Sequence, residues 1–80
     1  MYYYVYILES LNYPEKYYTG YTTDIKKRLV KHNEGGSIYT SLYKPWKVKT
    51  AIAFNDKEKA IHFEKYLKSH SGRAFVKKHF

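Results

Sequence analysis

The stretch YTGYTTDIKKRLVKHN, residues 18–33, changes from a strand pattern to a helix pattern within a few residues. The residues up to Gly20 are largely aromatic and β-branched, which is typical of a strand. Asp24 follows two threonines and offers a helix N-cap with an acidic first turn. We therefore predict a strand over residues 16–20 and a helix over residues 24–32, which ends before two consecutive glycines.

Upstream of this stretch, residues 2–8 form another run of aromatic and β-branched residues, which predicts a first strand. The segment Asn12–Pro14 marks a turn, so the two strands are expected to pair as a hairpin. The N-terminal run carries no basic segment and no small-residue cleavage site. We interpret it as a strand and not as a signal peptide.

Downstream of the helix, residues 37–46 are polar and aromatic and contain a proline, which predicts a loop with one helical turn. Residues 47–54 then alternate: Val48, Thr50 and Ile52 share one side, and lysines and alanines share the other. This alternation predicts a third strand with one mostly apolar face.

Two helices are predicted for the C-terminal part of the chain. Asn55 and Glu58 have the spacing of a capping box, which predicts a helix over residues 56–69. A Ser-Gly pair then interrupts the pattern, and residues 73–80 form a short basic helix. The order β-β-α-β-α-α predicts a single α+β domain over residues 1–80, with a small three-stranded antiparallel sheet flanked by helices.

The composition narrows the classes of partner. The formal charge is +8, from 15 Lys and Arg against 7 Asp and Glu, so the expected partners are nucleic acid first and an anionic membrane surface second. A basic protein without a specific partner is the alternative. The absence of cysteine excludes disulfides and thiolate zinc sites and suits the cytoplasm. No apolar run approaches the roughly 20 residues of a membrane span. We expect a cytoplasmic monomer.

The first predicted helix carries two candidate functional residues. Arg28 and His32 are four residues apart and therefore lie on one face, one turn from each other. Ile25 and Leu29 lie on a neighbouring face that can pack on the sheet. The alternative is that Arg28 and His32 belong to a solvated basic face together with the lysines of this helix.

The second predicted helix places one carboxylate among apolar residues. At about 100° per residue, Glu64 falls in the stripe formed by Ala60, Phe63 and Leu67. Burying an unpaired carboxylate is costly, so a cation or a metal is expected beside it. The alternative is that Glu64 lies at the edge of the stripe and pairs with Arg28 or with a lysine. The lysines of this helix are predicted to lie mostly on a solvated face: Lys57, Lys59, Lys65 and Lys68.

Taken in order, these residues resemble the GIY-YIG nuclease family. The resemblance rests on Tyr4-Val5-Tyr6, then Tyr18-Thr19-Gly20, then Arg28 with His32, and then Glu64 in a helix. Arg28 and His32 follow the second tyrosine motif at the spacing of that family. The resemblance covers nearly all 80 residues. It is strongest to the small single-domain branch related to the N-terminal nuclease domain of the excision-repair nuclease.

The resemblance implies a DNA endonuclease that hydrolyses phosphodiester bonds with one divalent ion, Mg²⁺ or Mn²⁺, and that acts in DNA repair or processing. It implies Glu64 as the metal ligand. It also implies Tyr18 as the general base that activates water, and Arg28 as the group that binds the scissile phosphate. Tyr6 and His32 would line the site and help to position water or phosphate.

The remaining positive charge fits contacts to DNA phosphates, which are independent of base sequence. The residues expected to make them are Lys26, Lys27, Lys31, Lys65, Lys68 and Arg73, with Lys77 and Lys78 nearby. No helix-turn-helix or zinc finger is present to read bases. A protein partner is therefore expected to supply specificity. The alternative function is a DNA-binding module that keeps the nuclease fold but cuts little alone, and a weaker one is a structural basic protein.

The chain departs from the family pattern at several positions. Tyr4 stands where the family name has Gly, and Thr19 stands where it has Ile. Tyr21 occupies a position at which the excision-repair branch carries Lys. The late Asn of many family members has no clear counterpart, and neither Ser71 nor Arg73 in that region is assigned a catalytic role. The two motif tyrosines themselves remain.

Overall fold

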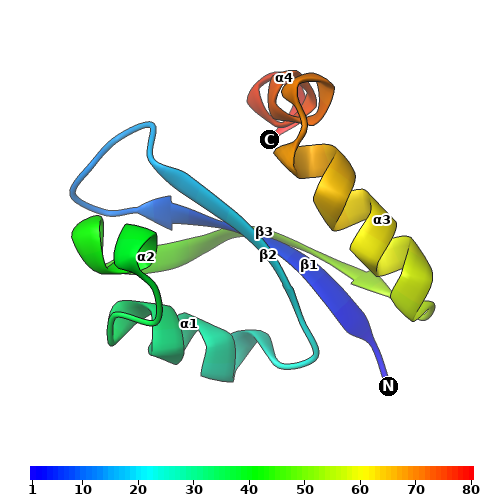
Figure 1. Ribbon diagram of the computed structural model, residues 1–80, viewed down its shortest axis with the longest axis horizontal. Helices are drawn as coiled ribbons and strands as arrows, with labels where there is room; N and C mark the ends of the chain where they lie inside the picture. The colour runs from blue at the N-terminus through cyan, green and yellow to red at the C-terminus, as the bar shows by residue number, and fades with distance from the viewer.

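A sheet of three antiparallel strands carries helices on both of its faces in the computed structural model, which describes all of residues 1–80 (Figure 1). The strand order is β2-β1-β3, so β1 is the central strand. The elements, in chain order, are β1 (Tyr3–Ser10), β2 (Tyr17–Thr22), α1 (Ile25–Asn33), α2 (Ile38–Leu42), β3 (Trp46–Phe54), α3 (Lys57–Lys68) and α4 (His70–His79). The predicted α+β class and the hairpin pairing are confirmed.

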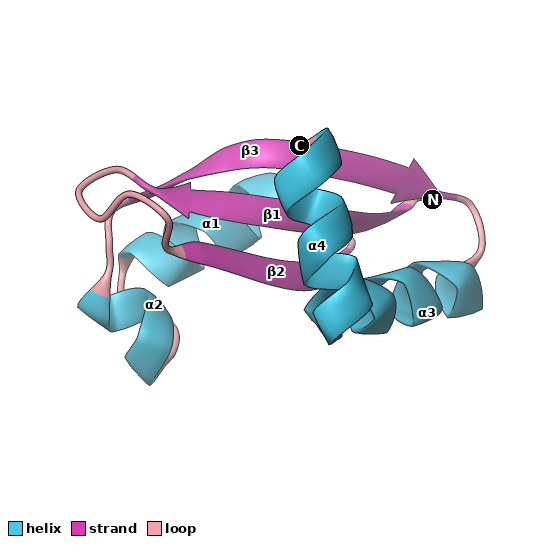
Figure 2. Ribbon diagram, turned by 90° about the horizontal axis from the view of Figure 1, so that it is seen from above, coloured by secondary structure: helices cyan, strands magenta, loops and turns pink.

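The central strand β1 supplies the core on both faces of the sheet. Its alternate side chains Val5 and Ile7 pack with Ala60 and Leu67 of α3. The side chains between them point the other way and pack with Trp46. Figure 2 shows α4 crossing the same face of the sheet that α3 covers, with α1 and α2 on the opposite face. Because successive strand residues face opposite sides, one apolar strand can hold both layers of helices.

A β-bulge in β3 changes which of its residues share a face. Ile7 pairs with Thr50, but the next residue of β1 pairs with Val48, so Lys49 is an extra residue. Beyond a bulge of one residue the side chains change face. The prediction that Val48 and Thr50 share one apolar face is therefore wrong. The bulge also turns Trp46, the first residue of β3, onto the face of Tyr6.

Helix ends differ from the predictions at two places. The N-cap of α3 is Asp56 and not Asn55, because the Asp56 carboxylate accepts hydrogen bonds from the backbone N–H groups of Glu58 and Lys59. The helix α4 begins at His70 and not at residue 73. Gly72 does not interrupt it: a Cβ there would lie 2.6 Å from the Leu67 Cα, so glycine allows α4 to approach α3 closely. None of the helices is both long and apolar enough to span a membrane.

The second strand runs through Gly20 and ends at Thr22, beyond the predicted end. Gly20 is therefore not at a tight turn; it lies opposite Tyr6 in the β1–β2 pairing. A Cβ at Gly20 would lie 2.5 Å from Cζ of Tyr6 and closer still to its hydroxyl oxygen. The Tyr6 ring therefore lies directly over β2, and only glycine leaves room for it.

Replacing Gly20 by Ala should lower the free energy of unfolding by about 1–3 kcal/mol, because an added methyl in a filled core forces the ring out of place. Urea denaturation followed by circular dichroism measures this. In a Tyr6→Leu background the same change should cost much less, because the clashing atoms are gone. Equal costs in the two backgrounds would show that the ring is not the constraint.

Candidate functional site

The five residues predicted as catalytic come from four elements and meet around the edge strand β2. Tyr6 lies on β1, Tyr18 on β2 and Glu64 on α3, while Arg28 and His32 lie on α1. In Figure 1, α1 and α3 lie on either side of β2. The structure therefore brings all five predicted residues into one region.

A buried pair, Tyr6 and His32, forms the floor of the region. The Tyr6 hydroxyl and His32 Nε2 are 3.0 Å apart, and the two residues are 1% and 5% exposed. Burial, with the nearby Tyr18, raises the pKa of Tyr6 to about 12, although the positive charge of Arg28 opposes the rise. Tyr6 therefore keeps its proton at neutral pH and cannot serve as a base.

The imidazole of His32 is held in its neutral form. Burial lowers its pKa below the usual 6.5, and the positive charges of Arg28 and Lys31 lower it further. Its Nδ1 atom is buried without a hydrogen-bond partner. We assign the ring proton to Nε2, because this leaves a lone pair and not an N–H group unsatisfied at Nδ1. The Tyr6 hydroxyl then accepts from His32, and its own hydrogen is available to another acceptor.

Tyr18 lies at the accessible side of the site. Its ring centroid is 4.6 Å from that of His32 and 6.4 Å from that of Tyr6. It is partly exposed and lines a cavity of about 450 Å³. The ammonium of Lys68 lies 5.7 Å from the centre of the Tyr18 ring. Of the two motif tyrosines, Tyr18 is the one that a ligand can reach.

The carboxylate of Glu64 is paired with a lysine of its own helix. Lys68 Nζ lies 2.8 Å from Glu64 Oε2, and the Glu64 side chain is only 18% exposed. The prediction that Lys68 lies on a solvated face away from Glu64 is wrong, because residues four apart on a helix are neighbours. Of the partners expected for Glu64, the structure shows the lysine. Lys68 thus links the carboxylate to the Tyr18 ring.

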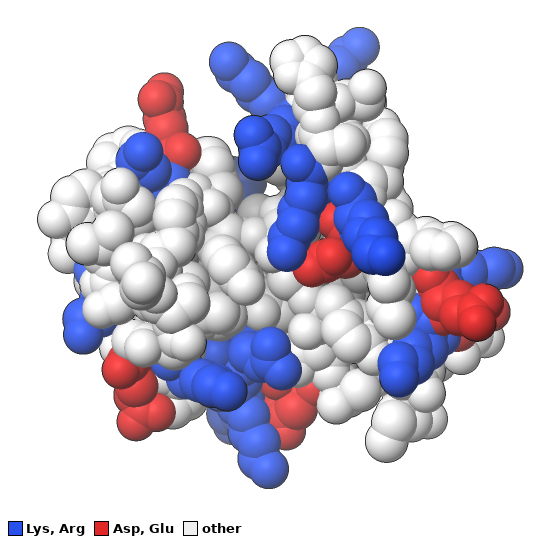
Figure 3. Space-filling model, in the orientation of Figure 1, with Lys and Arg blue, Asp and Glu red and all other residues white.

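Positive side chains gather in two groups on either side of the site. Figure 3 shows one group over α1 and another over α3 and α4, with a band of uncharged atoms between them. All six residues predicted to contact DNA are exposed: Lys26, Lys27 and Lys31 on α1, Lys65 and Lys68 on α3, and Arg73 on α4. Arg73 and Lys68 also line the cavity that Tyr18 reaches.

Comparison with known proteins identifies the family. The family model described as "GIY-YIG catalytic domain" matches residues 2–78. The chain belongs to the GIY-YIG family. The departures at Tyr4, Thr19 and Tyr21 therefore lie within the variation of a GIY-YIG domain. The family is one of nuclease domains, which supports nuclease, endonuclease and hydrolase chemistry as its general class.

Several similar proteins are small GIY-YIG chains named only as UPF0213 proteins. UPF0213 protein SAG0778 of Streptococcus agalactiae is 40% identical over 80 residues, which covers 95% of this chain and 89% of that protein. UPF0213 protein BH0048 of Halalkalibacterium halodurans is 42% identical over 74 residues, which covers 91% of this chain and 77% of that protein. The solution NMR structure of BH0048 from Bacillus halodurans superimposes with a TM-score of 0.58 at 37% identity, covering 98% of this chain and 84% of that one. The predicted GIY-YIG fold is confirmed.

The residues of this GIY-YIG site fit only one class of metal centre. The structure contains no group of three or more His, Cys, Asp or Glu side chains that could hold a metal ion. That excludes a closed zinc or calcium site built from such groups. A single carboxylate, Glu64, beside tyrosine hydroxyls suits a hard ion such as Mg²⁺, which keeps most of its water ligands.

Two residues of the site were not predicted from the sequence. Tyr39 of α2 donates a hydrogen bond from its hydroxyl to the carbonyl oxygen of Tyr17 at 3.0 Å, and its ring centroid lies 6.3 Å from that of Tyr18. It lies in a segment expected to be mostly loop, so no periodicity pointed to it. Lys68 as the partner of Glu64 could have been found from the spacing of four residues alone.

Stability should fall on acidification because of His32. Its pKa is lowered on folding, so below about pH 6.5 the unfolded chain binds a proton that the folded chain resists. The free energy of unfolding should therefore be highest above this pH and decrease as the pH falls towards 5. Urea denaturation across this range measures the effect. The variant His32→Gln should lose the pH dependence, whereas His62→Gln, at an exposed position of α3, should keep it.

Proposed function

We propose that this GIY-YIG chain is a divalent-metal-dependent DNA endonuclease that hydrolyses phosphodiester bonds. The observation that carries the proposal is the meeting of Tyr18, Arg28 and Glu64 around the buried pair of Tyr6 and His32. A reachable hydroxyl, a cation and a carboxylate in one place suit the activation of water and the stabilisation of a phosphate. The charge of +8 supports a polyanionic substrate.

Tyr18 would act as the general base. Because burial keeps Tyr6 protonated, the proton of the attacking water has to pass to the other motif tyrosine. An ionised Tyr18 would take that proton as the water oxygen forms its bond to phosphorus and the bond to the leaving strand oxygen breaks. Lys68, 5.7 Å from the ring centre, would stabilise negative charge on Tyr18 before the transfer.

Arg28 would bind the scissile phosphate. It lies close enough to Tyr6 for its positive charge to affect that residue, so a phosphate held by Arg28 would also lie near the Tyr6 hydroxyl. The free hydrogen of that hydroxyl would then be donated to a phosphate oxygen or to the attacking water. The neutral His32 would position Tyr6 for this contact. A guanidinium placed in advance stabilises charge that develops on phosphate oxygens.

Glu64 would hold one Mg²⁺ or Mn²⁺ ion. When bound, the ion supplies a Lewis acid for the phosphate and supports the leaving oxygen. Glu64 would have to exchange its contact with Lys68, which engages Oε2 at 2.8 Å. The released ammonium would remain beside Tyr18 and the substrate phosphate, so its charge would be kept within the site.

The two groups of cations would hold the DNA over the site. Lysines of α1 lie on one side of β2, and Lys65, Lys68 and Arg73 lie on the other. A strand that spans both groups would cross Tyr18. Contacts to phosphates alone do not read bases, so we propose that a protein partner directs the enzyme to its substrates in the cytoplasm, in DNA repair or processing.

Substitution of the proposed catalytic groups should abolish cleavage without unfolding the chain. With Mg²⁺ or Mn²⁺ and branched, nicked, single-stranded and duplex DNA as substrates, Tyr18→Phe and Glu64→Gln should each lower the rate by at least about 100-fold. Arg28→Ala should lower it by about 100- to 1000-fold. Gel electrophoresis of labelled DNA measures the rates.

The matched controls are Tyr2→Phe and Glu58→Gln, which change an exposed tyrosine and an exposed carboxylate outside the site. Both should retain full activity. Cleavage that persists unchanged in Glu64→Gln would mean that a contaminant, and not this chain, cuts the DNA.

A second function is favoured by the ion pair of Glu64 with Lys68. If the lysine holds the carboxylate too tightly for a metal to bind, the chain would bind DNA but cut little by itself. Such a module would still show the salt-dependent affinity of phosphate contacts. Titration of labelled DNA between about 50 and 200 mM salt, without metal, measures this binding. The comparison of binding with turnover then distinguishes the two functions.

Removing the Lys68 charge should strengthen metal binding if Glu64 is the metal ligand. Lys68→Met should lower the Kd for Mn²⁺ several-fold, as measured by the broadening of NMR signals around Glu64. Lys65→Met removes the same charge from α3 without breaking the ion pair and should have a smaller effect. Equal effects of the two substitutions would show that Lys68 does not compete with the ion.

A further inference from the structure

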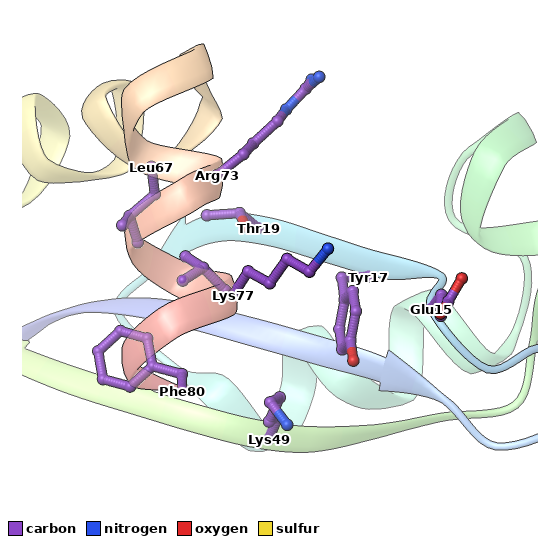
Figure 4. A pocket seen from close by; sticks show the side chains of 9 residues that line it. Glu15, Tyr17, Thr19, Lys49, Leu67, Arg73, Lys77 and Phe80 are labelled. Carbon is purple, nitrogen blue, oxygen red and sulfur yellow. The ribbon is translucent and has the colours of Figure 1, made fainter.

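A groove lies on the face of the sheet opposite Tyr6, between α4 and the strands. It is a cavity of about 460 Å³. Figure 4 shows the Lys77 side chain extending from α4 towards Tyr17, with Lys49 on the strand below and Glu15 at the end of the groove. We call it the α4 groove. None of the catalytic roles proposed above uses it.

The α4 groove adjoins the cavity of the catalytic site. The two cavities share Glu15, Tyr17, Thr19, Leu67 and Arg73, and only the catalytic one includes Tyr18 and Lys68. Tyr17 and Tyr18 are consecutive residues of β2, so their side chains face opposite sides of the sheet. Because β2 is the edge strand, a flexible chain lying at Tyr18 can pass over this edge and reach Tyr17.

The chemistry of the α4 groove is that of a site for a base and its phosphate. The Tyr17 residue is 38% exposed, and Lys49 Nζ lies 5.6 Å from the centre of its ring. Arg73 and Lys77 line the groove from α4. Aromatic rings beside cations in a groove are the common features of sites for unpaired nucleotides.

The acidic groups near the groove do not cancel this charge. Glu9 contacts two lysines, Lys47 at 3.4 Å and Lys49 at 3.7 Å, and Lys49 is therefore partly neutralised. Glu15 is the one carboxylate that lines the groove. Arg73 and Lys77 appear in none of the salt bridges of the structure. These two cations are therefore available to a phosphate.

We propose that the α4 groove binds an unpaired nucleotide of the substrate strand, next to the phosphate held at Tyr18, with its base stacked on Tyr17. A cavity of about 460 Å³ has the size of a small-molecule site; one nucleotide fits it and a duplex does not. The inference rests on the proposed function. It defines the substrate class as DNA with an unpaired segment beside the cut, as at a flap, a branch or a single strand.

The test compares two labelled DNA hairpins that differ only in an unpaired oligo-dT tail, by fluorescence anisotropy without metal. The tail should tighten binding to the unmodified chain about tenfold, as expected for one stacked base. The variant Tyr17→Ala should lose this gain, and Tyr17→Phe should keep it. The exposed Tyr2, outside the groove, gives the control Tyr2→Ala, which should keep the full gain. Circular dichroism verifies that each variant is folded.

The charges provide a second, independent readout. Glu15→Gln removes the repulsive carboxylate of the groove and should increase the gain from the tail, whereas Lys77→Met should reduce it. The matched control Lys57→Met, in the first turn of α3 and outside the groove, should leave the gain unchanged. A gain that survives in Tyr17→Ala would overturn the proposal. So would a loss of affinity in that variant that is the same for both hairpins.

This measurement separates the groove from the nuclease proposal. Tail-dependent binding that needs Tyr17, without cleavage of any DNA, would support the groove and contradict the nuclease function. Cleavage that needs Tyr18 and Glu64, with no effect of the tail or of Tyr17, would contradict the groove alone. Free thymidine monophosphate as a competitor distinguishes capture of a loose nucleotide: displacement of both hairpins equally would overturn the proposal, because the groove would then not hold the substrate strand.

Discussion

The fold and the site both depend on the placement of one side chain, the Tyr6 ring, over Gly20. A filled protein interior leaves no room for an added methyl, so the ring holds β1 and β2 in a single register. At its far end the hydroxyl contacts His32 Nε2 at 3.0 Å, and this contact fixes α1 relative to the sheet. Since Arg28 lies one turn before His32 on the same helix, the same ring also determines where the guanidinium lies.

The environment gives two similar tyrosines different chemistry. Tyr6 is 1% exposed, and its pKa is raised to about 12, chiefly by burial. It can donate a hydrogen bond but cannot take up a proton at neutral pH. Tyr18 lines a cavity, with a lysine ammonium 5.7 Å from its ring centre. Both belong to the GIY-YIG motifs, and burial alone assigns one to positioning and leaves the other free to react.

Local patterns in the sequence were sufficient for the elements, but not for contacts between them. Alternation and helical periodicity predicted all three strands and the helices, because those signals come from burial of one face. The bulge at Lys49 has no such signal, since it depends on the packing of Trp46 across the sheet. Gly72 was interpreted as a break because the approach of α4 to α3 is a tertiary contact. The catalytic set was predicted through family resemblance; the charge of Glu64 alone left lysine and metal as equal candidates.

The edge position of β2 explains how so small a chain could select DNA without reading its bases. In a central strand, neighbours on both sides separate the two faces, and no ligand can touch consecutive side chains. At the edge, Tyr17 and Tyr18 point to opposite faces but are separated only by the backbone of β2 itself. A paired strand is too stiff to turn around that edge, whereas an unpaired one can. On the proposed function, selection would therefore depend on the flexibility of the DNA beside the cut and not on its sequence.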